Sequence, residues 1–141
     1  MWLAAARMAL SLMPTLLSSG VLGQSRFETG DLKGFTKSPT EHIINRHEAL
    51  VKIWVFEGTI VDPTGAPIPG AIVEVRGPGP NETVKGTVSD KRGRFKFGHL
   101  KEGAYAFKIT FNGFQSVVGA LRIARSAKPD AAFKVALLLG V

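Results

Sequence analysis

The sequence predicts an all-β protein built as a β-sandwich. From residue 51 to the C-terminus, short apolar stretches alternate with clusters of Gly, Pro, Asn and Asp, spaced about every 8 to 12 residues as in sandwiches. Several stretches alternate apolar and polar residues with a period of two, which is typical of a strand with one buried face. No helical pattern separates them, so a parallel sheet with crossover helices is not expected.

The first two strands of the predicted sandwich flank a turn rich in proline and glycine. Apolar and polar residues alternate in residues 56–62 and again in residues 71–76. Between them, Asp62 and Gly65 supply turn chemistry, and the prolines that follow lack the backbone donors that strand pairing needs. We therefore expect residues 56–62 and 71–76 to form a half-buried antiparallel pair.

Five further strands complete a predicted set of seven. They are expected at residues 83–90, 94–97, 105–111, 114–124 and 131–139. Ahead of the set, residues 51–56 are apolar on both faces, which indicates a strand entering a covered sheet. Residues 135–139 are also apolar on both faces, so they need cover from residues 51–55 or from a second subunit.

The first 23 residues resemble an export signal. Arg7 precedes an apolar run, and small residues follow that run up to Gly23. We expect cleavage after Gly23 and a secreted or periplasmic product; the alternative is a membrane anchor formed by the uncleaved signal. Pro14 interrupts the run, which is shorter than the about 20 apolar residues of a spanning helix, so we expect no transmembrane helix after cleavage.

Residues 24–50 are polar and mixed, and they predict a short arm that is partly disordered or helical. Ser38 or Thr40 could cap a helix over residues 41–50, in which Ile43, His47 and Leu50 share a face. The chain therefore divides into a signal peptide (1–23), an N-terminal arm (24–50) and a β-sandwich domain (51–141).

The chain is basic, with a formal net charge of +7. Removal of Arg7 leaves 17 basic against 11 acidic residues, or +6. Outside the cell, such an excess favours an anionic glycan or envelope polymer over nucleic acid, although dispersed charge also serves solubility. The chain has no cysteine, so it has neither disulfides nor thiol chemistry, and an exported domain of this kind is typical of a bacterial envelope.

Several turn residues, read in order, carry a family resemblance. They are Gly58, Asp62, Gly65, Pro67, Pro69, Gly70, Ser89, Asp90, Gly93, Phe95, Leu100, Gly103, Tyr105, Gly113 and Phe114. Over residues 54–139 this pattern resembles the carboxypeptidase regulatory-like domain. The resemblance implies a transthyretin-like, carbohydrate-binding-like fold, a seven-stranded Greek-key β-sandwich. It also implies a non-catalytic module, of the kind that accompanies metallocarboxypeptidases, outer-membrane transporters and adhesins.

Three loops are expected to share one end of the sandwich, because alternate loops of antiparallel strands fall at the same end. These are residues 62–69, 90–93 and 112–115. Their polar residues form the candidate ligand site: Asp62, Lys91, Arg92, Asn112 and Gln115. Asp62, Asp90 and Asn112 could supply oxygen ligands to a cation, but Lys91 and Arg92 oppose one, so we expect the aspartates to cap their turns instead.

A zinc hydrolase is a remote alternative. His99 and Glu102 match the His-x-x-Glu of the metallocarboxypeptidase zinc site, but no histidine follows His99 to complete the ligands. His42 and His47 lie in the arm, at a spacing that would place them on different helix faces. We therefore expect no metal, no cofactor and no catalytic residue.

Two other activities of similar folds lack their diagnostic residues. The hydroxyisourate hydrolases, which resemble transthyretin, end in Tyr-Arg-Gly-Ser, whereas this chain ends in Leu-Gly-Val. A cross-linked adhesin module needs an asparagine on its last strand, but residues 131–139 contain none, and Lys108 stands where an acid is expected.

Two non-enzymatic functions remain. A binding module would use the loop-end residues or Trp54, the only tryptophan after residue 23, to hold a glycan. Packing in the core is the plainer role for Trp54, because it lies in an apolar strand. An assembly module would instead pair with another protein through an edge strand.

Overall fold

The computed structural model describes residues 32–77, 79, 81–127 and 133–140, and the compact unit that contains every strand begins at Gly34. The predicted signal peptide lies outside the described residues. Within them there is no α-helix, and hence none with the length and apolar character that crossing a membrane requires.

Nine strands are present in the described part of the chain. They are β1 (Ile44–Arg46), β2 (Val51–Ile53), β3 (Glu57–Val61), β4 (Ile72–Arg76), β5 (Lys85–Val88), β6 (Arg94–Lys96), β7 (Gly103–Thr110), β8 (Ser116–Ile123) and β9 (Phe133–Ala136). Each strand from β3 to β9 overlaps one of the seven predicted ranges, whereas β1 and β2 lie outside that set.

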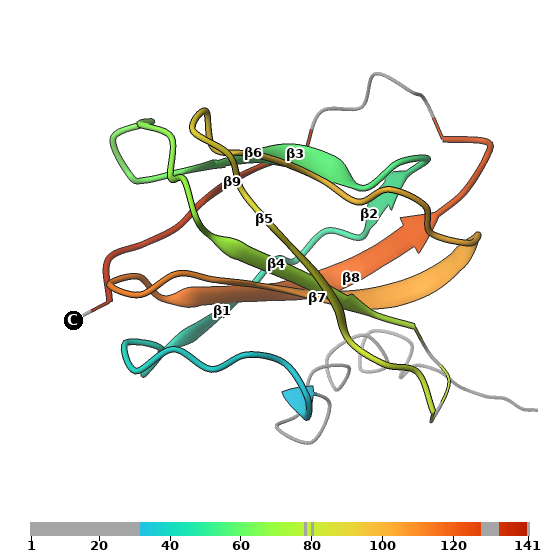
Figure 1. Cartoon of the computed structure of the whole chain (residues 1–141), viewed down its shortest axis with the longest axis horizontal. Helices are drawn as coiled ribbons and strands as arrows, with labels where there is room; N and C mark the ends of the chain where they lie inside the picture. The colour runs from blue at the N-terminus through green and yellow to red at the C-terminus, as the bar shows by residue number, and fades with distance from the viewer. Residues whose placement is uncertain (1–31, 78, 80, 128–132, 141) are drawn as a thin grey trace, which may run out of the picture. The chain divides into compact units, whose positions relative to one another are not determined.

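The strands form two sheets that lie face to face (Figure 1). In the larger, here called sheet A, the order is β1-β8-β7-β4-β5, and β2 also pairs with β8. In the smaller, here called sheet B, the order is β6-β3-β9. The all-β sandwich predicted from the sequence agrees with this arrangement.

An aromatic cluster fills the space between the sheets. The ring of Phe56 lies 5.1 to 5.7 Å from four other phenylalanine rings. These belong to Phe95, Phe97, Phe107 and Phe133, and all five side chains are buried. Because aromatic rings bury large apolar areas and pack edge to face, this cluster accounts for much of the hydrophobic stabilisation between the sheets.

The predicted pairing of residues 56–62 with residues 71–76 is wrong. β3 pairs with β6 and β9 in sheet B, whereas β4 pairs with β5 and β7 in sheet A. The turn first folds back on β3, where the Ile68 N–H donates to the Ile60 carbonyl at 2.9 Å, and the chain then crosses to sheet A. Alternation identifies a half-buried strand, but it does not identify the strand's partner.

The arm does not contain the predicted helix. Residues 44–46 form β1, which pairs in parallel with residues 116–118 of β8, and β2 pairs in the same way with residues 121–123. The two short strands satisfy backbone groups along an edge of β8 that would otherwise be unpaired, and this outweighs a weak local helix pattern. The predicted strand 51–56 ends at Ile53, because the chain there leaves sheet A for sheet B.

Of the two predicted sources of cover for residues 135–139, the structure favours the chain itself, because Ile53 lies in the same buried cluster as Val135 and Leu137. β9 lies beside β3, and its inward-facing residues are buried in the core: Phe133, Val135 and Leu137. Beyond β9, the Gln115 N–H donates to the Leu138 carbonyl at 2.8 Å, which ties the C-terminal segment to the start of β8. The side chains of Leu138 and Leu139 stay 47% and 60% exposed.

Candidate functional site

Asp62 caps the turn that follows β3. Its Oδ1 accepts hydrogen bonds from the Thr64 hydroxyl at 2.6 Å, the Thr64 N–H at 2.8 Å and the Ala66 N–H at 3.0 Å. The bond from the Thr64 hydroxyl is the main reason that the pKa of Asp62 lies below its ordinary value. The predicted capping role is confirmed.

Asp90 repeats this geometry in the turn between β5 and β6. Its Oδ1 accepts hydrogen bonds from the N–H groups of Arg94 and Arg92, each at 2.9 Å. These two bonds, the one from Arg94 foremost, lower the pKa of Asp90. Both carboxylates are therefore engaged with their own turns.

The loops 62–69 and 90–93 lie at one end of the sandwich, as predicted, and they are close enough that a Cβ at Gly93 would lie 3.0 Å from Pro67 Cβ. The Ile60 N–H donates to the Gly93 carbonyl at 2.7 Å. Gly93 has a φ of +73°, and a Cβ at this position would lie 2.5 Å from the Ile60 carbonyl oxygen. Glycine is therefore required where the two loops meet.

The third loop lies at the same end (left in Figure 1), but its polar residues have other roles. Gln115 donates from Nε2 to the Leu139 carbonyl at 3.0 Å and accepts from Asn45 Nδ2 at 2.7 Å. It therefore joins β8 to β1 and to the C-terminal segment. Asn112 is exposed. The structure gathers the three predicted loops at one end, yet Asp62 and Gln115 are occupied by internal hydrogen bonds.

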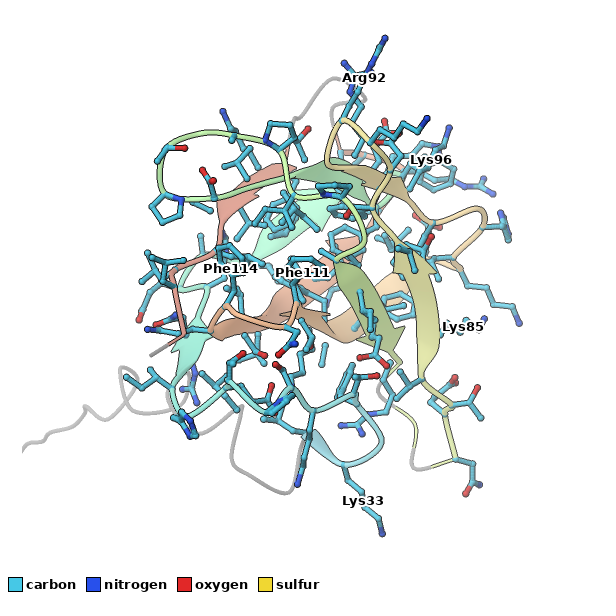
Figure 2. All side chains as sticks on the ribbon, turned by 60° about the vertical axis from the view of Figure 1, so that its left-hand side comes forward. Lys33, Lys85, Arg92, Lys96, Phe111 and Phe114 are labelled. Atoms are coloured by element: carbon cyan, nitrogen blue, oxygen red, sulfur yellow. The ribbon has the colours of Figure 1, made fainter. Side chains whose placement is uncertain are left out.

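Lys91 and Arg92 belong to a larger basic surface. Both are exposed at the turn before β6, and Arg92 projects from the molecule in Figure 2. Arg94 and Lys96 follow on β6 and are exposed, because the residue between them, Phe95, faces the core.

A more distant strand contributes a further cation to this surface. Arg94 lies opposite Thr59, and Thr59 lies beside Lys134 of β9. We call the outer surface of sheet B and its adjoining turn the basic face; it comprises Lys91, Arg92, Arg94, Lys96 and Lys134. The alternation of Lys134 with Phe133 and Val135 is visible in the sequence, but its proximity to Arg94 is not.

One carboxylate pairs with the basic face. Glu57 Oε2 lies 3.9 Å from Lys96 Nζ, and both side chains are largely exposed. The second acid nearby, Asp90, is held in its turn by the bonds described above, and its negative charge also interacts with Arg92 and Arg94. The basic face is thus left with an excess of positive charge.

The outer face of sheet A carries an ion pair that sequence reasoning missed. Lys108 of β7 is only 1% exposed, and its Nζ lies 2.8 Å from Glu41 Oε2 and 2.7 Å from the Thr36 carbonyl oxygen. Ser116 of β8 also donates to Glu41. In the sequence, a lysine between the apolar Phe107 and Ile109 could have indicated a charged residue within a strand of the sheet. No nearby residue identifies its partner in the arm.

A second contact fastens the arm to the same face. Glu74 of β4 is buried, and its two carboxylate oxygens accept the Thr36 N–H at 2.9 Å and the Thr36 hydroxyl at 3.0 Å. The Arg76 guanidinium lies 5.0 Å from the centroid of the Phe35 ring. The arm therefore covers the outer face of sheet A.

A pocket of about 320 Å³ lies between the β4–β5 and β6–β7 loops. Its lining includes Val75, Glu82, Lys85, His99, Lys101 and Tyr105. The Tyr105 hydroxyl donates to the Lys101 carbonyl at 2.6 Å, which holds the β6–β7 loop as one wall. Burial and, to a smaller extent, the charge of Glu82 raise the pKa of Tyr105, so this phenol stays neutral.

Trp54 is half-buried and packs against the core, the plainer of its two predicted roles. The Arg125 guanidinium lies 5.6 Å from the centroid of its ring. Trp54 also lines a small cavity of about 80 Å³, of which His99 forms another wall. Its ring thus already has an internal stacking partner.

His99 and Glu102 both line the 320 Å³ pocket, but Glu102 is held by Arg125. Glu102 Oε1 accepts the Arg125 N–H at 2.8 Å, and Oε2 lies 3.9 Å from Arg125 Nε. His47 packs against the Phe133 ring at 5.5 Å. Among the described residues, no three His, Cys, Asp or Glu side chains gather where a metal ion could be held.

A sequence comparison finds one family. The model of the carboxypeptidase regulatory-like domain matches residues 55–136. A search of curated proteins finds no match.

A search of solved structures finds catechol 1,2-dioxygenases among its matches. The 3-chlorocatechol 1,2-dioxygenase of Rhodococcus opacus is 14% identical, with a TM-score of 0.42 over 64% of this chain and 60% of that one. Catechol 1,2-dioxygenase of Pseudomonas arvilla is 10% identical, with a TM-score of 0.44 over 68% and 57%. This chain thus spans about 60% of the length of these enzymes. Similarity at this level carries no functional argument.

Proposed function

This chain belongs to the carboxypeptidase regulatory-like domain family, and on that premise we propose that it is an exported, non-catalytic module that binds an anionic polymer of the cell envelope. The basic face is the proposed contact surface. Export is inferred from the charged, apolar and small-residue order of residues 1–23.

The observation that carries this proposal is the distribution of charge over sheet B. Five cations lie on one exposed surface against two carboxylates: Glu57, 3.9 Å from Lys96, and Asp90, whose charge interacts with Arg92 and Arg94. Exposed cations of like sign repel one another and attract a polyanion from solution, and salt screens this attraction. A polymer with repeated negative charges can contact several of the cations at once.

The proposal that the module is non-catalytic is supported by its family and by the internal bonds that engage its carboxylates. Asp62 and Asp90 are held by their turns, Glu102 is held by Arg125, and Glu41 is paired with Lys108. Two of these carboxylates also accept a hydroxyl, Asp62 from Thr64 and Glu41 from the buried Ser116, and these contacts fix the turn and the arm.

Polysaccharide binding tests the proposal. The purified chain should bind polygalacturonate, a carboxylate polymer, more tightly at low than at high salt, and should ignore neutral dextran. Replacing Arg94→Glu together with Lys134→Glu should weaken binding by about tenfold or more, because attraction turns to repulsion at both positions. The matched control is Lys37→Glu with Lys52→Glu, which changes the net charge equally at exposed positions off the basic face.

Two results would count against the proposal. Equal losses in the two double variants would mean that net charge matters and the basic face does not. Equal binding of dextran and polygalacturonate would mean that charge is not recognised.

A second candidate function is assembly through the edge strand β5. Ser89 donates its N–H to the Ala71 carbonyl, so the alternation of antiparallel bonds directs the backbone groups of Gly86 and Val88 away from β4. Val88 is 58% exposed, and such an edge can pair with another chain. Sedimentation should then show a concentration-dependent dimer that Val88→Lys abolishes. A monomer at all concentrations excludes self-assembly through this edge.

A further inference from the structure

The pocket between the β4–β5 and β6–β7 loops carries charges that the fold leaves uncompensated. Lys85 and Lys101 line it and are exposed, and neither forms an ion pair with any carboxylate among the described residues. The carboxylate of Glu102 is taken by Arg125. In the described part of the chain, two lysines without an ion-pair partner thus line the pocket with two acids, Glu82 and Glu102, of which Glu102 is paired with Arg125.

Two glycines leave space for the Glu82 side chain, which lines the pocket. A Cβ at Gly77 would lie 3.1 Å from Glu82 Cδ, and one at Gly79 would lie 3.2 Å from Glu82 Cγ. The two glycines let the Glu82 side chain lie back against its own loop. This acid is therefore positioned as a hydrogen-bond acceptor on one wall.

The remaining wall is apolar. Val75 of β4 and the half-buried ring of Tyr105 line the pocket, and the bond from the Tyr105 hydroxyl to the Lys101 carbonyl orients that ring. Pockets of about 300 Å³ and larger, with an apolar wall and a few polar groups, are typical of small-molecule sites. This one combines an aromatic surface, two cations and an acceptor.

We infer that this pocket binds a single acidic sugar, a pyranose ring that carries a carboxylate. The sugar carboxylate pairs with Lys85 and Lys101, the ring packs on Tyr105 and Val75, and ring hydroxyls donate to Glu82. A neutral sugar leaves both ammonium groups without a counter-charge, and an inorganic anion makes no use of the apolar wall. The site lies beyond the proposed function, since it takes a monomer and shares no residue with the basic face.

Calorimetric titration with galacturonate and with galactose tests the inference, because the two sugars differ in the carboxylate alone. Galacturonate should bind and galactose should bind at least about tenfold more weakly, as a charge-assisted bond predicts. Lys85→Gln with Lys101→Gln should lower galacturonate affinity by a similar factor. Lys37→Gln with Lys52→Gln, and separately Trp54→Ala, should leave it unchanged. Thermal unfolding should confirm that each variant is folded.

Four outcomes overturn the inference: no binding of galacturonate to the folded chain, equal binding of galactose, tighter binding of glutamate, or no loss in the Lys85→Gln, Lys101→Gln variant. Glutamate would indicate an amino-acid site, with Glu82 holding an ammonium group. The proposed function is judged separately, by polygalacturonate and the Arg94→Glu, Lys134→Glu variant. Failure of the monomer with retention of the polymer rejects the pocket alone.

Discussion

The two sheets differ in how the charged side chains on their outer faces are exposed. On sheet A, Lys108 is buried beneath the arm and paired with Glu41. On sheet B, Arg94 and Lys134 are exposed to solvent. A buried charge must be neutralised within the fold, whereas an exposed one remains available to a ligand. The comparison teaches that net charge by itself does not locate a binding surface.

The largest expected effect comes from breaking the buried pair. Glu41→Ala leaves the Lys108 ammonium group buried without its counter-charge, and it should lower the free energy of unfolding by about 3–5 kcal/mol. Denaturant unfolding measures this. The matched variant on sheet B is Glu57→Ala, which removes an exposed partner of Lys96 and should cost at most about 1 kcal/mol. Similar costs for the two variants would contradict the contrast between the faces.

Lowering the pH should weaken the ion pair between Glu41 and Lys108 on sheet A. Burial raises the pKa of Glu41, but the bonds from Lys108 and Ser116 and the charge of Lys108 outweigh it and hold that pKa below 4.5. Because the folded-state pKa is the lower one, the contribution of Glu41 is complete above pH 4.5 and is lost as pH falls through the folded-state value.

Urea unfolding at a series of acidic pH values checks this direction. Stability should fall less steeply with decreasing pH in Glu41→Gln than in the wild type. Asp62 and Asp90, whose pKa values are also lowered, contribute to the slope that remains. An unchanged slope in Glu41→Gln would show that the pair does not titrate in this range.

A smaller effect is expected from paired threonine substitutions. Thr36→Val removes the hydroxyl that donates to the buried Glu74 carboxylate and should cost about 1–3 kcal/mol. Thr59→Val, in the middle of the basic face, should change stability by no more than about 0.5 kcal/mol. Chemical denaturation of both variants gives the comparison. Equal costs would mean that the arm contact through Thr36 contributes no more than the half-buried Thr59 does.

The smallest effect on stability should come from the basic face itself. Arg94→Glu with Lys134→Glu should change the free energy of unfolding by no more than about 1 kcal/mol, because both side chains are exposed. The same variant should lose polygalacturonate binding. A large loss of stability would instead assign these cations a structural role.

Local patterns were sufficient for the strands and the turn caps. Phe95 and Phe97 alternate with Arg94 and Lys96, and that period identifies both a strand and its buried face. The capping of Asp90 could be predicted because its bonds reach only two and four residues along the chain. The candidate residues Lys91 and Arg92 were placed correctly at an exposed turn for the same reason.

Contacts between distant segments were not accessible in this way. Lys108 and Glu41 are 67 residues apart, and Thr36 and Glu74 are 38 apart. Local helix capping favoured a helix in the arm, but the unpaired edge of β8 made β1 the better use of its backbone groups. The expected partners β3 and β4 were separated because each is flanked by two other strands in a different sheet.

The sequence by itself thus determined an all-β chain, the approximate positions of seven of the nine described strands, its turn caps and its family, because these depend on residues a few positions apart. Tertiary structure alone decided which charged side chains remain available to a ligand. It buried Lys108 under the arm. It brought Lys134 and Arg94 to either side of Thr59, and it placed Lys85 and Lys101 around one pocket. The physical reason is that burial and electrostatic pairing depend on distance in space, which periodicity along the chain does not encode.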